Sequence, residues 1–370
     1  MAFCQVRHHR NINIQQIDCQ STMPILMSET TPKRILFIRP SALGDVCRSV
    51  PVIESLRKQW PDASIDWLVQ SEFVAAVAAH PAIDSVIQFP RNCMGRWYTP
   101  KGFLKSLAFL RLLKSKKYDL VIDGQGLARS GLFSWATRAS TRIGLASARE
   151  FGWLGYTKKV SVTCPHTVDQ MLSLSEAAGA TTTIDMQLYV NQEDETWWKE
   201  KQIKNNLDSY VVLAPTSRWE SKQWPIERFS SLSEYFQIRG KQVVVVGAPH
   251  EAKQIATLVN DSVLNLLPEM TVGRLMAVIS TSSFVIANDS AALHMAVGFN
   301  TPCIGLFGPT DPTCAGPYHL DDSVVSADVN YDEVHYRDPS IGNRIMEQIE
   351  VQDVIDKIEE RMAAETLVSE

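Results

Sequence analysis

The residues best suited to chemistry stand where short apolar segments end and helices are predicted to begin. The segment RILFIR is followed by PSALGD, which ends at Asp45. Gly44 allows a close approach of the backbone, and Asp45 stands at the start of a predicted helix, where it can act as a base or simply cap that helix. The loop lacks the second and third glycines of a dinucleotide-binding fingerprint, which argues against a nicotinamide site.

A second loop combines hydroxyl and basic side chains. It follows the apolar segment YVVLA and reads PTSRWESKQWP, with Thr216, Ser217 and Lys222 in it. Hydroxyls and cations in a loop before a helix can hold phosphate oxygens. The alternative is an exposed polar loop with Trp224 packed beneath it.

Two further carboxylates follow buried segments. Glu251 comes after VVVVGAPH, where it can accept hydrogen bonds from ribose hydroxyls or stabilise the first turn of its own helix. The segment FVIANDSAALHMA carries Asp289 and Ser290 to a helix start, whose N–H groups and dipole attract a pyrophosphate. His294 lies one turn further on. Each of these residues has a structural alternative, as a helix cap or an ordinary helical histidine.

Short apolar strands alternate with amphipathic helices along the chain, which is typical of parallel sheets covered on both faces. The predicted strands are RILFIR, SIDWLVQ, SVIQF and YDLVIDG, then YVVLA, QVVVVGA, SFVIAND and PCIGLFG. Helices are predicted over GDVCRSVPVIESLRKQW, EFVAAVAA, Gly102–Lys117, Glu251–Val259 and Ile345–Ala364, and from Leu127, Pro225, Val272 and Ser290. The fold class is therefore α/β, with two doubly wound halves whose ligands bind in a cleft beyond the carboxyl ends of the strands.

The chain divides into five predicted parts. Residues 1–33 are polar and rich in Gln and Asn, which predicts a disordered leader without an assigned function. The two sheets belong to residues 34–190 and 210–344. Residues 191–209 are charged and lack strand character, as expected of a linker, and residues 345–370 form a terminal helix and tail.

The composition describes an ordinary globular chain of 370 residues, 45% hydrophobic and 21% charged, with a net charge of −5. This charge gives no reason to expect nucleic-acid binding. The seven cysteines are scattered and form no CxxC pair. Their pattern argues against a zinc site or a disulfide framework and fits a reducing cytoplasm. No apolar run approaches the roughly 20 residues of a membrane-spanning helix.

Taken in order, these segments resemble the ADP-heptose:lipopolysaccharide heptosyltransferases, glycosyltransferase family 9. The resemblance rests on LGD, SRWESKQWPIERF, GAPHE, NDSAALHMA and FGPTDP, and it covers residues 34 to 365. It implies the GT-B architecture, in which two Rossmann-like domains face each other across a cleft. It also implies inverting transfer of a heptose from ADP-heptose to the inner core of lipopolysaccharide, with a lipid A–Kdo or heptosyl acceptor.

The resemblance implies a role for each matching residue. Asp45 matches the catalytic base. Donor-binding positions are Thr216, Ser217, Lys222, Glu251, Asp289, Ser290, Ala291 and His294. Acceptor-binding positions are Arg129, Ser130 and His166, the last at the start of a helix. Further basic candidates for contact with an anionic glycolipid are Arg96, Lys101, Lys105, Arg138 and Arg142.

These residue types suit the implied reaction. A carboxylate takes the proton of the attacking sugar hydroxyl, while N–H groups and Lys222 take up the charge of the departing diphosphate. The sequence has no recognisable DxD-like pair, so we expect transfer without an obligatory divalent cation and without a cofactor. The implied location is the cytoplasm, with peripheral contact at the inner membrane.

Two alternatives stay open on the sequence alone. One is a sugar-nucleotide epimerase of the same architecture, which turns over its substrate without an acceptor. The other is a nucleotide-sugar-binding protein without catalysis, in which Asp45→Asn changes nothing. The transferase hypothesis differs from both because it requires Asp45 and Lys222, remote in the chain, to face one groove.

Overall fold

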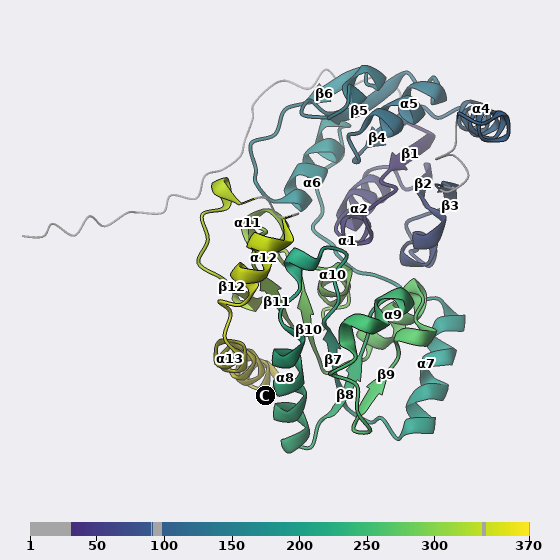
Figure 1. Ribbon diagram of the computed structural model, residues 1–370. Coiled ribbons are helices and arrows are strands. Elements are labelled where there is room, and N and C mark those ends of the chain that lie inside the picture. The colour runs from purple at the N-terminus through teal and green to yellow at the C-terminus, as the bar shows by residue number, and fades with distance from the viewer. Residues whose placement is uncertain (1–30, 90, 92–97, 335–337, 370) are drawn as a thin grey trace, which may run out of the picture. The chain divides into compact units, whose positions relative to one another are not determined.

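The computed structural model describes residues 31–89, 91, 98–334 and 338–369 (Figure 1). From Thr31 onward the chain clusters into one compact unit. Apart from its last three residues, the predicted leader lies outside the described residues, as do Cys93 and Arg96. Among the residues described, no helix is both long and apolar enough to cross a membrane.

The first sheet is parallel throughout and has the strand order β3-β2-β1-β4-β5-β6. Its strands are β1 (Arg34–Ile38), β2 (Ser64–Gln70), β3 (Ser85–Phe89), β4 (Leu120–Asp123), β5 (Thr141–Leu145) and β6 (Lys158–Val160). The order reverses between β1 and β4, which is the switch point at which open parallel sheets bind ligands.

The second sheet repeats this plan with the order β12-β11-β10-β7-β8-β9. Its strands are β7 (Tyr210–Ala214), β8 (Gln242–Val245), β9 (Val263–Asn265), β10 (Phe284–Asn288), β11 (Cys303–Phe307) and β12 (Val324–Ser326). All its pairs are parallel. Here the switch point lies between β7 and β10.

Helices cover both faces of the sheets. The first half contains α1 (Leu43–Cys47), α2 (Val50–Gln59), α4 (Pro100–Ser115), α5 (Ala128–Thr137) and α6 (Thr167–Ala177). The rest of the chain contains α7 (Gln192–Asn205), α8 (Ile226–Ile238), α9 (Val272–Ser280), α10 (Ala291–Gly298), α11 (Pro312–Ala315), α12 (Pro339–Met346) and α13 (Val351–Ser369). Short 3₁₀ helices include η1 (Ser71–Ala76), η2 (Gly152–Gly155), η3 (Glu220–Lys222) and η4 (Pro249–Ile255).

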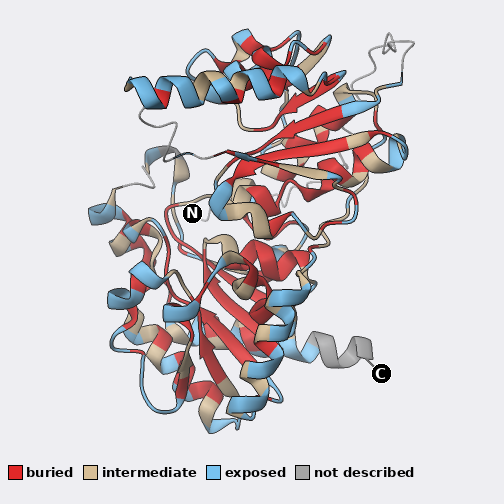
Figure 2. Cartoon of the chain, turned by 90° about the vertical axis from the view of Figure 1, so that its right-hand side faces the viewer, coloured by how far each residue is buried: buried red, intermediate tan, exposed pale blue. Residues whose placement is uncertain are grey.

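The central strands, such as β1, β7, β10 and β11, are buried on both faces, as the predicted continuous apolar runs require (Figure 2). Along β1, Ile35 and Phe37 belong to one apolar cluster, whereas Leu36 and Ile38 belong to another that contains Phe133 of α5. This alternation follows from the two-residue period of a strand. The cluster around Phe37 also includes side chains of β7 and β10, so the two sheets share apolar packing.

Four helix predictions were wrong in form. The helix predicted after Gly44 is two helices, α1 and α2, because Pro51 has no N–H to continue α1 and instead occupies the first turn of α2. The segments EFVAAVAA and Glu251–Val259 form the 3₁₀ helices η1 and η4 rather than α-helices.

The predicted terminal helix Ile345–Ala364 was also wrong, since it is divided between α12 and α13. The Glu350 N–H is accepted by Asp353, which caps the second helix, and Ile349 is buried in the break. The apolar spacing runs on through the break, which is why periodicity alone merged the two helices.

The predicted linker forms a packed helix. Asn191 caps α7 by accepting the Asp194 N–H, and α7 contacts α9. The buried Trp198 donates its indole N–H to the Tyr210 hydroxyl at 2.9 Å. The polarity of the sequence hid this packing, because only Trp198 is fully buried, with Trp197 packed beside it, in a helix rich in charged residues.

Candidate active site

Most of the predicted site residues follow the strands that flank the two switch points, whereas Glu251 follows β8 and His166 follows β6. Asp45 comes after β1, Arg129 and Ser130 after β4, and the loop with Lys222 after β7. Asp289 and the start of α10 come after β10. Because the carboxyl ends of parallel neighbouring strands lie at the same edge, the order of strands alone gathers these loops in pairs.

Asp45 lies in α1 and is held by three donors. Its Oδ1 contacts Arg48 Nη2 at 2.7 Å and Arg39 Nη2 at 3.2 Å, and its Oδ2 accepts the Ala42 N–H at 3.2 Å. Burial raises the pKa of Asp45, but the two guanidinium groups and the Ala42 N–H outweigh it and hold the pKa well below its usual range. The capping alternative therefore describes a real contact, yet 27% of the side chain remains exposed.

Lys222 pairs with Asp289. The last residue of η3 places its Nζ 2.6 Å from Asp289 Oδ2, across 67 residues of sequence. Both side chains are largely buried. The loop that carries Lys222 is fixed by Asn288, whose side chain accepts the Trp224 N–H at 3.1 Å and donates to the Pro215 carbonyl at 2.6 Å.

His294 of α10 lies against α1, the element that carries Asp45. α1 contacts α10, and a Cβ added to Gly44 would lie 2.8 Å from His294 Cδ2. Burial, followed by Arg48, lowers the pKa of His294 well below its usual value, so the ring is neutral. Asp45 raises this pKa and Lys222 lowers it further, so the electrostatic surroundings of this one side chain include both residues.

Three donor-binding candidates follow strands of the second sheet. Thr216 and Ser217 are buried, and Ser217 Oγ lies 3.5 Å from the Asp289 carbonyl oxygen, to which it donates. Glu251 Oε2 accepts the Ala248 N–H at 2.8 Å, so the contact observed is the one that stabilises the start of its own helix. Trp224 is buried beneath the loop, as the structural alternative expected.

Ser290 is the N-cap of α10 but makes no side-chain capping bond. Ala291 is the first residue of the helix and is half-buried. The N–H groups of this first turn have no acceptor four residues earlier within the helix. They are therefore suited to an anion at the start of α10, beside the Lys222–Asp289 pair.

The acceptor-binding candidates differ in accessibility. Arg129 is exposed, with its guanidinium 5.5 Å from the centre of the Phe89 ring. Ser130 is buried, and its hydroxyl exchanges hydrogen bonds with the backbone of Leu127, so it stabilises the start of α5. His166 is the N-cap of α6. Its Nδ1 accepts the Val168 N–H, and its Nε2 lies 3.2 Å from the Gly316 carbonyl oxygen.

The other basic candidates belong to the same half. Lys101 and Lys105 are exposed on α4. Arg138 lies over the Trp135 ring at 3.9 Å. Arg142 donates to the carbonyl oxygens of Gly155 and Ala139, which makes it a structural residue.

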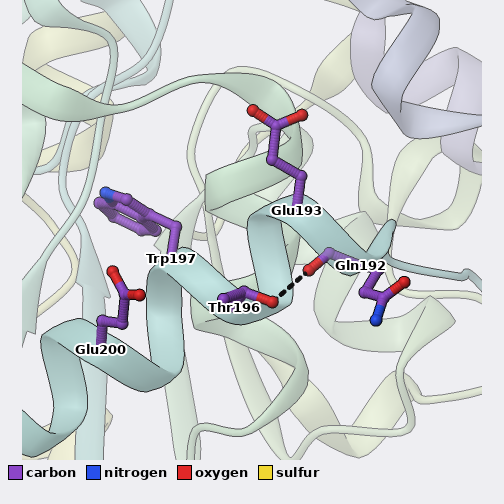
Figure 3. A pocket seen from close by; sticks show the side chains of 5 residues that line it. All are labelled: Gln192, Glu193, Thr196, Trp197 and Glu200. Atoms are coloured by element: carbon purple, nitrogen blue, oxygen red, sulfur yellow. Dashed lines mark hydrogen bonds between the residues drawn. The ribbon is translucent and has the colours of Figure 1, made fainter.

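A surface depression of about 470 Å³ lies elsewhere, on α7 (Figure 3). It is lined by Gln192, Glu193, Thr196, Trp197 and Glu200. None of the predicted site residues lines it. Within the described ranges, no group of three or more His, Cys, Asp and Glu side chains could hold a metal ion.

The family is decided by a match to the model of glycosyltransferase family 9 (heptosyltransferase), which spans residues 106–341. The chain belongs to this family. It is therefore a glycosyltransferase, and the predicted family is confirmed. The epimerase and the non-catalytic binding protein are not supported by this assignment.

Curated relatives of this family 9 glycosyltransferase match over most of its length. "Lipopolysaccharide core heptosyltransferase OpsX" of Haemophilus influenzae is 24% identical, over 88% of this chain and 95% of the relative. "Lipopolysaccharide heptosyltransferase 1" of Escherichia coli K12 is 25% identical, over 80% of this chain and 93% of the relative.

Solved structures confirm the predicted GT-B architecture. "E. coli heptosyltransferase WaaC with ADP" has a TM-score of 0.72 and 24% identity, and the match covers 89% of this chain and 99% of that one. "Structure of E. coli ADP-heptose lps heptosyltransferase II" has a TM-score of 0.74 and 19% identity, covering 90% of this chain and 99% of that one.

Sequence reasoning missed three residues of the site in this glycosyltransferase. Arg39 and Arg48 were assigned to a strand end and to a helix interior, yet both pair with Asp45. Asn288 was treated as part of a strand, although it ties that strand to the Lys222 loop. A polar side chain inside a buried strand was the available signal, because such a group needs hydrogen-bond partners.

Proposed function

We propose that this glycosyltransferase moves a heptose from ADP-heptose to the inner core of lipopolysaccharide, with inversion, and that Asp45 is the general base. The observation that carries the proposal is the meeting of α1 and α10 at Gly44 and His294, with Asp45 on one element and the Lys222–Asp289 pair beside the other. The relatives' names support the sugar and the acceptor class.

The donor diphosphate belongs at the start of α10. The first-turn N–H groups and the Lys222 ammonium neutralise charge on the departing ADP, and electrostatic stabilisation of this kind is often the largest part of catalysis. Thr216 and Ser217 supply hydroxyls beside it. Glu251 reaches the ribose only if one carboxylate oxygen stays on the Ala248 N–H while the other turns to the sugar, a division that a carboxylate permits.

The acceptor hydroxyl belongs beside Asp45. The carboxylate is ionised at neutral pH, because its pKa is lowered by Arg39 and Arg48 in spite of burial. It is thus ready to take a proton, although its positive neighbours make it a weak base. Arg129, exposed at the start of α5, is the candidate for acidic groups of the acceptor, with Ser130 and His166 in support.

Contact with a membrane surface is supported by one helical layer of the first half. α4 contacts α5, and α5 contacts η2. Their exposed apolar side chains are Phe103, Leu104, Leu112, Leu132, Trp135, Phe151 and Leu154. Between Tyr98 and Val160, twelve Lys and Arg residues stand against three acidic residues, in a chain with a net charge of −5. Such a surface fits anionic head groups, as at the cytoplasmic face of an inner membrane.

The test is transfer by the purified full chain. ADP-heptose and a lipid A–Kdo acceptor are incubated with it, and mass spectrometry and NMR read the mass and the anomeric configuration of the product. We expect one added heptose of inverted configuration. If neither ADP nor ADP-heptose raises the unfolding temperature, and no heptose is added to either Kdo-terminated or heptosylated acceptors, the proposal is wrong.

A further inference from the structure

Arg48 carries buried hydrogen-bond donors that the described protein does not use. Its side chain is 10% exposed. Nη2 contacts Asp45, but Nε and Nη1 have no hydrogen-bond partner among the residues that the structure describes. A guanidinium is charged at every relevant pH. Burying its N–H groups without hydrogen-bond partners therefore destabilises the folded protein. The arrangement therefore lacks a group that accepts hydrogen bonds from Nε and Nη1.

The charges around Asp45 point to the same conclusion. Arg39, 9% exposed, and Arg48 both pair with one oxygen of this single carboxylate, and Arg39 Nε is another donor without a described partner. The nearby His294 and His166 carry no negative charge that could balance the arginines, and burial, the main cause, lowers their pKa values. Two cations thus share one anion at a largely buried place.

We propose that Arg48 and Arg39 form an oxyanion subsite beside Asp45, which binds a carboxylate of the sugar acceptor or a phosphate of the donor. Arg48 follows α1 three residues after Asp45, so a bound oxyanion lies within one helical turn of the proposed base. The inference rests on the proposed function for the identity of the two substrates. The acceptor is the expected source, because Arg48 is carried by the same element as the base rather than by α10.

The subsite explains how an acceptor hydroxyl is positioned. An acidic group held by Arg48 fixes the adjoining sugar ring against Asp45, and a neutral acceptor lacks this attachment. Arg48 thus selects acidic acceptors. An exposed arginine such as Arg129 contributes less, since its guanidinium stays hydrated and its ion pairs are screened.

The experiment compares the full-length wild-type protein with Arg48→Gln, Arg48→Lys and a control, Arg239→Gln, which removes the exposed arginine that follows α8. Steady-state transfer gives KM and kcat for lipid A–Kdo acceptors with free and with methyl-esterified carboxyl groups. Calorimetry gives the Kd of ADP, of pyrophosphate and of free Kdo, the octulosonic acid of the acceptor. Urea unfolding establishes that each variant is folded.

For Arg48→Gln we expect the KM of the free-acid acceptor to rise about tenfold or more, the loss of one charge-assisted hydrogen bond. The KM of the esterified acceptor and the Kd of ADP should change less than about twofold, and Arg48→Lys should recover part of the loss. A tenfold weaker binding of ADP and pyrophosphate, with acceptor KM unchanged, also supports the subsite and assigns it to the donor.

The inference is overturned if folded Arg48→Gln binds ADP, pyrophosphate, octulosonic acid and both acceptors as the wild type does. It is also overturned if free and esterified acceptors lose affinity equally while donor binding is unchanged, because Arg48 then acts only through the local structure. If the wild type transfers no heptose, the proposed function fails, whereas calorimetry with pyrophosphate and octulosonic acid still decides about the subsite.

Discussion

Replacing Asp45 by asparagine separates a catalytic carboxylate from one that only caps a helix. Asparagine keeps an acceptor for the Ala42 N–H but loses the charged contacts with Arg48 at 2.7 Å and Arg39 at 3.2 Å. Buried hydrogen bonds to charged groups contribute about 1.5–3 kcal/mol each. Because the two contacts share one oxygen and 27% of the side chain is exposed, we expect the free energy of unfolding to fall by roughly 2 kcal/mol in all.

The kcat of Asp45→Asn should fall much further than its loss of folding stability can explain. Removing a general base costs on the order of 100-fold or more in kcat, while the Kd of ADP should stay within about threefold. Asp84→Asn is the matched control. Asp84 also pairs with an arginine, Arg57 at 2.5 Å, and accepts a backbone N–H, that of Ile65, but it lies away from the site.

The assay is product formation measured by mass spectrometry under saturating donor and acceptor, with urea unfolding of the same preparations. The hypothesis of a catalytic base is refuted if Asp45→Asn retains a kcat within about tenfold of the wild type while remaining folded. A loss of equal size in Asp84→Asn refutes it as well, since the effect is then one of stability.

Three further predictions concern pH, packing and membrane contact. The pKa of Asp45 lies below its usual value of 3.8, so the stability that its charge contributes is present above pH 3.8 and is lost only as the pH falls through the lowered pKa. The difference in unfolding free energy between wild type and Asp45→Asn should therefore be constant from about pH 8 to 5. Gly44→Ala places a Cβ 2.8 Å from His294 Cδ2, so we expect the free energy of unfolding in urea to fall by about 1–3 kcal/mol and ADP to bind more weakly. An unchanged midpoint of urea unfolding would contradict this contact. Leu132→Glu combined with Trp135→Glu should release the protein from vesicles with anionic lipid in a flotation assay, without changing transfer to a detergent-soluble acceptor; undiminished binding by the double variant argues against the α4–α5 surface.

The sequence predicted the strands that carry continuous apolar runs and missed β5, β6, β9 and β12; β5 reads TRIGL, which contains no such run. Runs such as FVIAN and VVLA can only be buried, and they are the central strands β10 and β7. The three-residue strands β6, β9 and β12 lie at or near sheet edges, where few apolar residues are needed. Their pairing depends on neighbouring strands, so no local pattern announces them.

The positions of the site residues were predictable, but their partners were not. Motifs that follow strands must lie at the carboxyl edge of a parallel sheet, which is enough to gather Asp289 and Lys222. That these two pair with each other, and that two arginines converge on Asp45, depends on side chains of separate elements. Arg48 in particular stands within a helical pattern, where sequence reasoning expects a solvated charge.

The pairing of Asp45 with arginines leads to a prediction about how the base gains strength. With both guanidinium groups on it, the carboxylate is ionised but weak. An oxyanion bound by Arg48 offsets that positive charge and therefore raises the pKa of Asp45 in the enzyme–substrate complex. Since kcat reports groups in the complex and kcat/KM those in the free enzyme, the acid limb of kcat should lie at higher pH than that of kcat/KM. In Arg48→Gln the two limbs should converge, because the residue whose charge is offset has been removed. Limbs that coincide in the wild type would show that substrate binding leaves the arginines on Asp45 undisturbed and would contradict the prediction.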